Sequence, residues 1–221
     1  MRNGGVGVGQ LITFEGPDGA GKTSVLNGLM PRLNAHLSQP ALLTREPGGT
    51  PIAEQIRELI LDPANTAMDA RTEALLYAAS RRQHLVEVIE PALAAGRVVI
   101  CDRFVDSSIA YQGAGRGIGE DAVRAINLFA TAGRQPDLTL YLDVPSAVGL
   151  ARIKAHQGER QYDRLDQEKE AFHLRVRQAY LDLAAASPTR IHTIDATQPL
   201  PQVIAECLSV LQQHLVSDWQ S

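Results

Sequence analysis

The chain has 221 residues, of which 44% are hydrophobic and 21% charged, a composition that fits one α/β domain with a full core. The net charge of -4 argues against a surface that coats nucleic acid, so any anionic substrate must meet locally concentrated positive charge. Two cysteines provide no disulfide framework and favour a reducing, cytoplasmic setting, and no apolar run approaches the ~20 residues of a membrane span.

Short apolar runs alternate along the chain with longer segments of helical period. Residues 1–9 are Gly-rich and predict a flexible tail without the apolar core of a signal peptide. The apolar runs predict five strands, at 10–15, 41–46, 97–102, 138–144 and 190–195. Helices are expected after the first Gly-rich loop, from residue 50 onward, over 70–94 and over 201–216. This alternation predicts a five-stranded parallel sheet with helices on both faces, in a single domain spanning residues 1–221.

The first strand is followed by the sequence GPDGAGKT, which matches G-x-x-x-x-G-K-[ST] and leads into a predicted helix. In that context backbone N–H groups and the helix dipole hold phosphate oxygens. Lys22 can reach the outer phosphates of a nucleoside triphosphate, and the Thr23 hydroxyl can ligate Mg²⁺. The residues expected to bind ATP are Gly16, Pro17, Asp18, Gly19, Ala20, Gly21, Lys22 and Thr23.

Two strands end in arginine. Asp102 and Arg103 end the third strand, and Arg45 ends the second, so both arginines lie at the edge that carries the Gly-rich loop. Asp102 can serve the Mg²⁺ shell. Two guanidinium groups there suit a phosphomonoester, although a strand-end Arg-Asp pair is also a common structural ion pair.

This pattern predicts phosphoryl transfer from ATP to a monophosphate. The attacking oxygen of a phosphomonoester is already ionised at neutral pH, so no general base is needed. Consistently, the six histidines have neither metal-ligand nor triad spacing. The sequence also lacks the Asn-Lys-x-Asp base reader of GTPases and the Asp-Glu strand end typical of mechanical ATPases.

Six segments together resemble bacterial thymidylate kinases and run in family order from about residue 11 to 196. They are FEGPDGAGKT, TREPGGT, EALLYAASRRQHL, CDRFVDSSIAYQGAGRGIG, PDLTLYLDVP and DRLDQE. The Gly-rich loop is generic, but REPGGT together with the DR…DSS segment is highly specific. The resemblance implies transfer of the ATP γ-phosphate, with Mg²⁺, to dTMP in a P-loop kinase fold that is usually a homodimer.

The resemblance also implies roles in dTMP binding. Tyr77 would stack on the thymine ring, and Arg81, one helical turn later, would donate to thymine O4 and so reject cytosine. Tyr111 would crowd the 2′ position of a ribose. The other expected dTMP-binding residues are Asp18, Arg45, Glu46, Pro47, Arg57, Arg103, Arg116 and the helically spaced pair Ser108 and Gln112.

A charged stretch at about 152–168 is either a solvated surface or a lid that closes over charged ligands. The variable positions of the Gly-rich loop contain no base, so the resemblance implies a lid arginine. Arg160 is expected to stabilise transition-state charge, while Arg164 would orient the lid or pack on the adenine. Arg152 is expected on the ATP side.

Asp18 places a carboxylate inside the phosphate loop. The resemblance implies that this acid faces the second substrate, by accepting from its 3′-hydroxyl or by pairing with Arg103. Two other functions stay open at this point. One is another nucleotide or deoxynucleoside kinase, and the other is a non-catalytic nucleotide-binding module.

Overall fold

The computed structural model describes residues 9–155, 164–215 and 219–220. Five parallel strands form one sheet in the order β2-β3-β1-β4-β5. They are β1 (Leu11–Glu15), β2 (Leu42–Arg45), β3 (Val99–Asp102), β4 (Leu138–Asp143) and β5 (Ile191–Asp195). Each predicted strand is confirmed to within two residues of its expected bounds.

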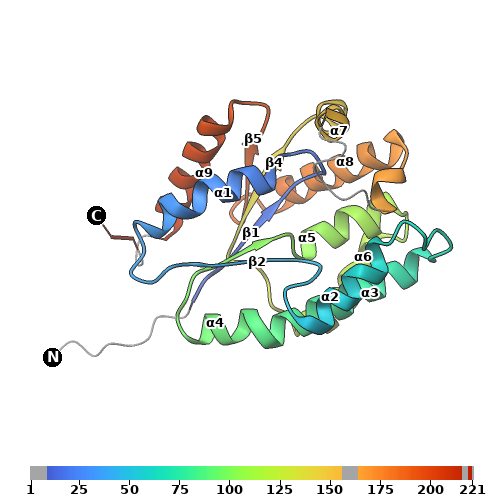
Figure 1. The fold of residues 1–221 in the computed structure, drawn as a ribbon, viewed down its shortest axis with the longest axis horizontal. Coiled ribbons are helices and arrows are strands. Elements are labelled where there is room, and N and C mark those ends of the chain that lie inside the picture. Colours follow the sequence, from blue (N-terminus) through green and yellow to red (C-terminus); the bar gives the residue numbers. More distant parts are fainter. Residues whose placement is uncertain (1–8, 156–163, 216–218, 221) are drawn as a thin grey trace.

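The sheet is covered on both faces because side chains alternate along each strand. In β1, Ile12 and Phe14 join the core under α1 (Lys22–Asn34) and α9 (Leu200–His214), which Figure 1 shows together on one face. Leu11 points to the opposite face, where it packs against the helices that follow β2. The two-sided arrangement predicted from the apolar runs is confirmed.

The second face carries most of the remaining helices. They are α2 (Pro51–Leu61), α3 (Ala70–His84), the π-helical turn η1 (Leu85–Ile89), α4 (Glu90–Ala94), α5 (Val105–Ser108), the π-helical segment η2 (Ile109–Gly115), α6 (Glu120–Thr131) and α8 (Glu170–Ala186). The predicted helix over 70–94 is helical throughout but contains the wider turn η1. This turn precedes Pro91, which has no N–H to donate to the preceding turn.

Two elements lie close to the charged stretch. They are α7 (Ser146–Ala155) and the 3₁₀ turn η3 (Arg164–Gln167). Residues 156–163 of the expected lid, and 1–8 of the expected tail, lie outside the described residues. In the described part of the chain, no helix has the length and hydropathy needed to cross a bilayer.

The strand order brings the loops of interest to one edge. Both Phe14 of β1 and Arg45 of β2 pair with Asp102 of β3, so the three strands end at the same level. The chain returns from β3 to the opposite side of β1 to form β4, which makes the edge beside β1 the point where ligands collect in open parallel sheets.

Candidate active site

The Gly-rich loop packs closely against its surroundings. Gly19 has φ +78°, and a Cβ atom there would lie 2.2 Å from the carbonyl oxygen of Gly149 in α7. A Cβ atom on Gly149 would in turn lie 2.7 Å from the Asp18 carbonyl oxygen. Both contacts are closer than real Cβ atoms allow, so glycine on each side lets the loop and α7 touch. The first residue of α1, directly after the loop, is Lys22.

The Lys22 side chain folds back over the loop. Its Nζ donates to the carbonyl oxygens of Gly16 at 3.0 Å and Pro17 at 3.3 Å. Burial, together with the nearby charge of Arg103, lowers the pKa of Lys22 to about 8. An anionic ligand beside Lys22 would favour the charged form of the ammonium, so the site is suited to phosphate.

Two cavities flank this loop. The cavity beside α3 has a volume of about 200 Å³, and the one beside α9 has a volume of about 480 Å³. We call them the α3-side cavity and the α9-side cavity. Both are lined by Asp18, Lys22 and Thr23, so the two cavities meet at the loop.

Most of the residues expected to bind dTMP line the α3-side cavity. These are Asp18, Glu46, Pro47, Arg57, Tyr77, Arg81, Arg103, Ser108, Tyr111 and Gln112. Ser108 and Gln112 both face it because α5 and η2 are helical, as the spacing predicted. Asp102 and Leu165 line the same cavity.

Arg103 occupies a left-handed backbone conformation, with φ +71°, directly after β3. Such a conformation costs a non-Gly residue about 1 kcal/mol or more and is concentrated at functional sites. Its Nη2 donates to Asp18 Oδ1 at 2.6 Å and to the Tyr111 hydroxyl at 3.2 Å. Its Nη1 donates to the Gly16 carbonyl and the Ser107 hydroxyl. Arg103 is therefore fixed to the phosphate loop itself.

Asp18 completes this arrangement from the loop side. Its second carboxylate oxygen accepts from the Tyr111 hydroxyl at 2.9 Å. Burial raises the pKa of Asp18, but the charges of Arg103 and Lys22 outweigh burial, and the pKa lies below its usual 3.8. Asp18 is thus an anion that faces the α3-side cavity, and of the two expected contacts the structure contains the one with Arg103.

A buried carboxylate that the sequence analysis missed stabilises the segment that directly follows Arg103. Glu15, at the end of β1, accepts from the backbone N–H groups of Phe104 and Ser107 and from the hydroxyls of Ser107 and Tyr180. Burial, reinforced by the charge of Asp106, raises the pKa of Glu15 to about 7. No local signal marks this network, because Tyr180 comes from α8, far along the chain.

Arg81 is 2% exposed and is held by four hydrogen bonds. Nε donates to Glu46 Oε2 at 2.7 Å, and Nη2 donates to the Phe104 carbonyl at 3.0 Å. Nη1 donates to the Ser108 hydroxyl and to Asn127. A guanidinium group has five N–H donors, so one Nη2 hydrogen has no acceptor among the described residues. Arg81 also lines the α3-side cavity.

Glu73 joins the walls of the same cavity. It is fully buried in α3 and accepts from Gln112, Arg116 and Arg164. Arg116 also pairs with Glu168 and does not line the cavity, although it was expected there. Arg164 donates to Glu73 and to the Ile60 carbonyl, a position that favours the expected role of orienting the lid over packing on an adenine.

Arg45 is not brought into either cavity. Its Nη2 pairs with Glu54 on the surface, and its Nη1 donates to the Pro47 carbonyl. Arg57 donates to the same carbonyl and does line the α3-side cavity. The arginines that line this cavity are therefore Arg57, Arg81 and Arg103, while the Arg45 side chain pairs on the surface.

The α9-side cavity contains one predicted side chain beyond the loop. Arg152 lines it and donates to the carbonyls of Gly19 and Ala196. Sequence reasoning missed Ala196, Gln198 and Leu200, which also line it. Their position directly after the last strand, at the carboxyl edge of the sheet, is the signal that could have identified them. Arg160 lies outside the described residues, so its role stays a prediction.

The residues expected near Mg²⁺ suit a hard cation. Asp102 Oδ1 is buried and, among the described residues, accepts no hydrogen bond, although such atoms are normally satisfied. Thr23 lines the same cavity. A carboxylate and a hydroxyl are oxygen donors of the kind that Mg²⁺ prefers.

Comparison with known proteins gives a consistent family. A family model described as thymidylate kinase matches residues 14–207. The chain is 71% identical over 206 residues to a thymidylate kinase of Latilactobacillus sakei, covering 93% of this chain and 96% of the relative. It is 70% identical to a thymidylate kinase of Lacticaseibacillus casei, covering 92% and 95%. A Levilactobacillus brevis thymidylate kinase is 59% identical, covering 93% and 96%.

Proposed function

The chain belongs to the thymidylate kinase family, and from this premise we propose how its two cavities carry out the reaction. The enzyme is a nucleoside monophosphate kinase that transfers the γ-phosphate of ATP to dTMP and forms dTDP and ADP. The observation that carries the proposal is the meeting of both cavities at Asp18, Lys22 and Thr23. A donor on one side and an acceptor on the other would join at these residues.

ATP occupies the α9-side cavity in this proposal. Its phosphates lie on the backbone N–H groups of the loop, at the N-terminus of α1, with Lys22 beside the outer phosphates. The adenosine then extends toward Arg152 and Gln198, which also line this cavity. The larger volume of the α9-side cavity, about 480 Å³, suits the larger nucleotide.

dTMP occupies the α3-side cavity. The thymine ring stacks on Tyr77, and O4 accepts the Arg81 N–H that no described residue uses. Cytosine presents an amino group at this position and would leave the Arg81 donor unpaired. Tyr111, fixed by Asp18 and Arg103, closes the space beside the sugar. The acceptor phosphate then faces Arg103 and Arg57.

The transfer is a single in-line displacement. A phosphate oxygen of dTMP forms a bond to the γ-phosphorus, and the bond from that phosphorus to the β–γ bridging oxygen breaks, which releases ADP. The attacking oxygen is already ionised, so catalysis is alignment and charge neutralisation by Lys22 and Arg103, aided by Arg160. Thr23 and Asp102 would hold Mg²⁺, which neutralises phosphate charge when it is bound.

A panel of acceptors tests this specificity. ADP release with ATP and Mg²⁺ is compared for dTMP, dCMP, UMP and thymidine. We expect kcat/KM to be highest for dTMP, with dCMP at least about 100-fold lower because Arg81 loses its acceptor. Equal rates with dTMP and dCMP would contradict the role of Arg81. Preference for thymidine would instead indicate a deoxynucleoside kinase.

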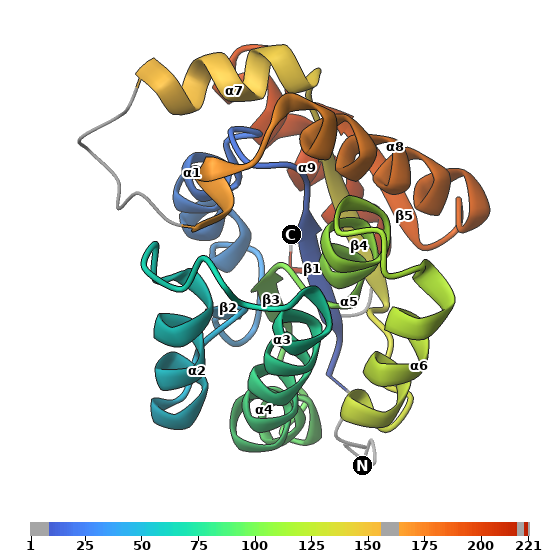
Figure 2. The same cartoon turned by 90° about the vertical axis from the view of Figure 1, so that its right-hand side faces the viewer.

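We also propose a homodimer in the cytoplasm. Exposed apolar side chains gather on α2, α3 and α6, which lie side by side in Figure 2. They are Ile52, Leu59, Leu75, Leu128 and Phe129, and we call this surface the α2–α3–α6 face. Exposed apolar side chains on adjacent helices support pairing with a second copy. Both cysteines are buried and unpaired, which suits a reducing compartment.

A further inference from the structure

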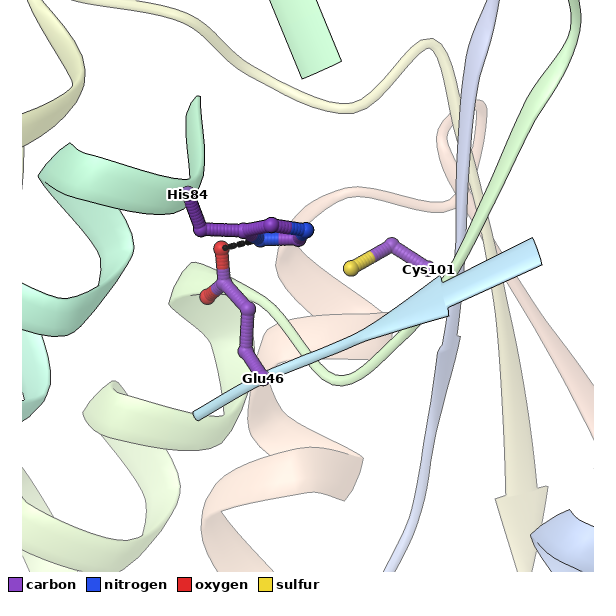
Figure 3. A group of neighbouring side chains, drawn as sticks. All are labelled: Glu46, His84 and Cys101. Atoms are coloured by element: carbon purple, nitrogen blue, oxygen red, sulfur yellow. Dashed lines mark hydrogen bonds and ion pairs between the residues drawn. The ribbon is translucent and has the colours of Figure 1, made fainter. Parts of the chain in front are cut away.

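Three buried side chains that could ligate a metal meet beneath the α3-side cavity. Figure 3 shows Glu46, His84 and Cys101 turned toward one another, and their ligand atoms lie within 4.8 Å. Each of these groups already has a protein partner. Glu46 pairs with the Arg81 cation, and the Cys101 thiol donates to the Arg103 carbonyl. A metal ion would have to displace a guanidinium group, so the cluster has another role.

The cluster forms a directional chain of hydrogen bonds. His84 Nδ1 lies 3.0 Å from Glu46 Oε1, and His84 Nε2 lies 2.7 Å from the Thr44 hydroxyl. A carboxylate only accepts, so Nδ1 carries the proton toward Glu46, and Nε2 of a neutral ring accepts from Thr44. The other oxygen of Glu46 accepts from Arg81 Nε at 2.7 Å. His84 is thus connected to Arg81 through one carboxylate.

The position of the Glu46 carboxylate determines how many Arg81 N–H groups remain for a ligand. In the structure Glu46 Oε2 accepts only from Arg81 Nε, and Oε1 is directed to His84 Nδ1. A carboxylate that is free to turn can take two adjacent N–H groups of one guanidinium in a bidentate pair. That pair would add a contact to Nη2 and use the one N–H that no described residue accepts. The hydrogen bond from His84 holds Glu46 Oε1 away from Nη2 and so keeps this N–H free for the base.

His84 is itself firmly placed. Its side chain is fully buried, and its ring lies against the backbone at Gly49, where an added Cβ atom would be 2.5 Å from Cδ2. No other orientation of the ring is compatible with both hydrogen bonds. Thr44 in β2 therefore fixes His84, His84 fixes Glu46, and Glu46 in turn binds the Arg81 guanidinium.

We propose that His84 is a positioning residue for thymine recognition, which acts by restraining Glu46 so that Arg81 keeps one N–H for the base. The inference rests on the proposed role of Arg81 in reading thymine O4. His84 touches neither substrate in this arrangement. Its effect is on the acceptor KM and on the choice of base, and it leaves ATP binding unchanged.

Two amide substitutions separate the contacts of His84. The amide of asparagine occupies the position of Nδ1 and still donates to Glu46, whereas the amide of glutamine occupies the position of Nε2 and reaches only Thr44. We expect His84→Gln to raise the KM for dTMP about tenfold and to lower the preference for dTMP over dCMP by a similar factor. His84→Asn should stay within about threefold of the parent, and the KM for ATP should not change in either variant.

Melting temperatures establish that the variants are folded. If His84→Gln does not fold, Thr44→Val makes the same test from a half-buried position, with an expected rise of about threefold in the KM for dTMP alone. An unchanged dTMP KM and base preference in the folded variant overturns the inference. Equal losses in His84→Asn and His84→Gln overturn it as well, because they indicate a packing role.

Arg81→Met, which has no N–H to offer O4, separates this inference from the base reading on which it rests. If Arg81→Met is folded and leaves the preference for dTMP over dCMP intact, Arg81 does not read the base, and the proposed roles of Arg81 and His84 are both wrong. If Arg81→Met removes the preference and His84→Gln does not, only the role of His84 is overturned. Loss of preference in both variants, with retention in His84→Asn, supports the connection from His84 through Glu46 to Arg81.

Discussion

At the scale of single residues, Arg103 connects the phosphate loop to the acceptor side. Its guanidinium donates to Gly16, Asp18, Ser107 and Tyr111, while its backbone is held in the left-handed region. The planar fork can serve several acceptors at fixed angles, which a lysine ammonium cannot do. Arg103 is therefore placed to neutralise charge at the junction of the two cavities.

Substitution of Arg103 by lysine tests this placement. We expect Arg103→Lys to raise the KM for dTMP and to lower kcat, with kcat/KM reduced at least about tenfold, because a point charge replaces the fork. Steady-state kinetics with dTMP as the varied substrate measure both constants. Arg177→Lys is the matched control, since Arg177 pairs with Asp143 away from both cavities. An unchanged kcat/KM in Arg103→Lys would remove Arg103 from the acceptor site.

Asp18 explains why a phosphate loop contains an acid. Its two carboxylate oxygens accept from Arg103 and Tyr111, so its charge is balanced by a guanidinium group that lines the α3-side cavity. Asp18→Asn keeps the shape but removes the charge that fixes the guanidinium. We expect the KM for dTMP to rise several-fold more than the KM for ATP. Equal rises in both constants would indicate simple damage to the loop.

At the scale of elements, Glu73 connects α3 to η2 and η3 beside the α3-side cavity. It stands in α3 and binds Gln112 of η2, Arg116 at its end and Arg164 of η3. Burial raises the pKa of Glu73, but the hydrogen bond and charge of Arg116 and the hydrogen bond of Arg164 outweigh burial, and the pKa lies below 4.5. The stabilisation is therefore complete above pH 4.5 and is lost as the pH falls through the lowered pKa.

Glu73→Gln should reveal this dependence. The unfolding free energy of the parent should fall as the pH is lowered from about 5 to 3, and that of the variant should fall less steeply. At pH 7 we expect a loss of about 3 kcal/mol, because Arg116 and the buried Arg164 lose the charge of a fully buried carboxylate. Denaturant unfolding across this pH range measures both effects.

Glu54→Gln is the matched control for an exposed pair. Glu54 binds Arg45 on the surface, with side chains 37% and 46% exposed. Solvent screens such pairs, so the expected loss at pH 7 is below about 1 kcal/mol. If Glu73→Gln costs no more than this control, Glu73 does not connect the three segments.

The elements themselves were largely predictable. Five apolar runs bounded by loops were sufficient to place the strands, and the Gly-rich loop fixed the start of α1. The π-helical turn at Leu85–Ile89 was not predicted, because a helical pattern ahead of a proline does not show how the chain accommodates the missing N–H.

The candidate site was predictable where its residues belong to contiguous motifs. Tyr77, Arg81, Ser108 and Gln112 line one cavity, as the resemblance and the helical spacing predicted. The partners that hold these residues were not predictable. Asn127 comes from α6 and Tyr180 from α8, and only the packing of these helices brings them to Arg81 and Arg103. For Arg45, the predicted position at the end of β2 is confirmed, but the direction of the side chain was not predictable. Its ion pair with Glu54 holds it on the surface.

At the scale of the whole molecule, the parallel sheet concentrates both cavities at one edge and leaves the α2–α3–α6 face exposed on the side of the helices. Phe129 is 91% exposed, beside Leu128 at 61%. Residues of this size are normally covered, and a symmetric pairing of the face with a second copy would bury them.

Phe129→Glu should weaken that pairing. We expect the parent to elute and scatter as a dimer in size-exclusion chromatography with light scattering, and the variant to shift toward a monomer at micromolar concentration. The charge replaces apolar burial worth about 2 kcal/mol or more for each of the two symmetric positions. Gln178→Glu, on α8 away from this face, is the control. A parent that is monomeric at all concentrations would contradict the homodimer.

The central claim is direct transfer between two cavities that meet at Asp18, Lys22 and Thr23. ATP made chiral at the γ-phosphorus with oxygen isotopes tests it, because the configuration of the phosphoryl group in dTDP counts the displacements. One in-line displacement inverts the phosphorus, whereas transfer through a covalent phosphoenzyme requires two and restores it. Direct transfer predicts inversion, and net retention of configuration would contradict it.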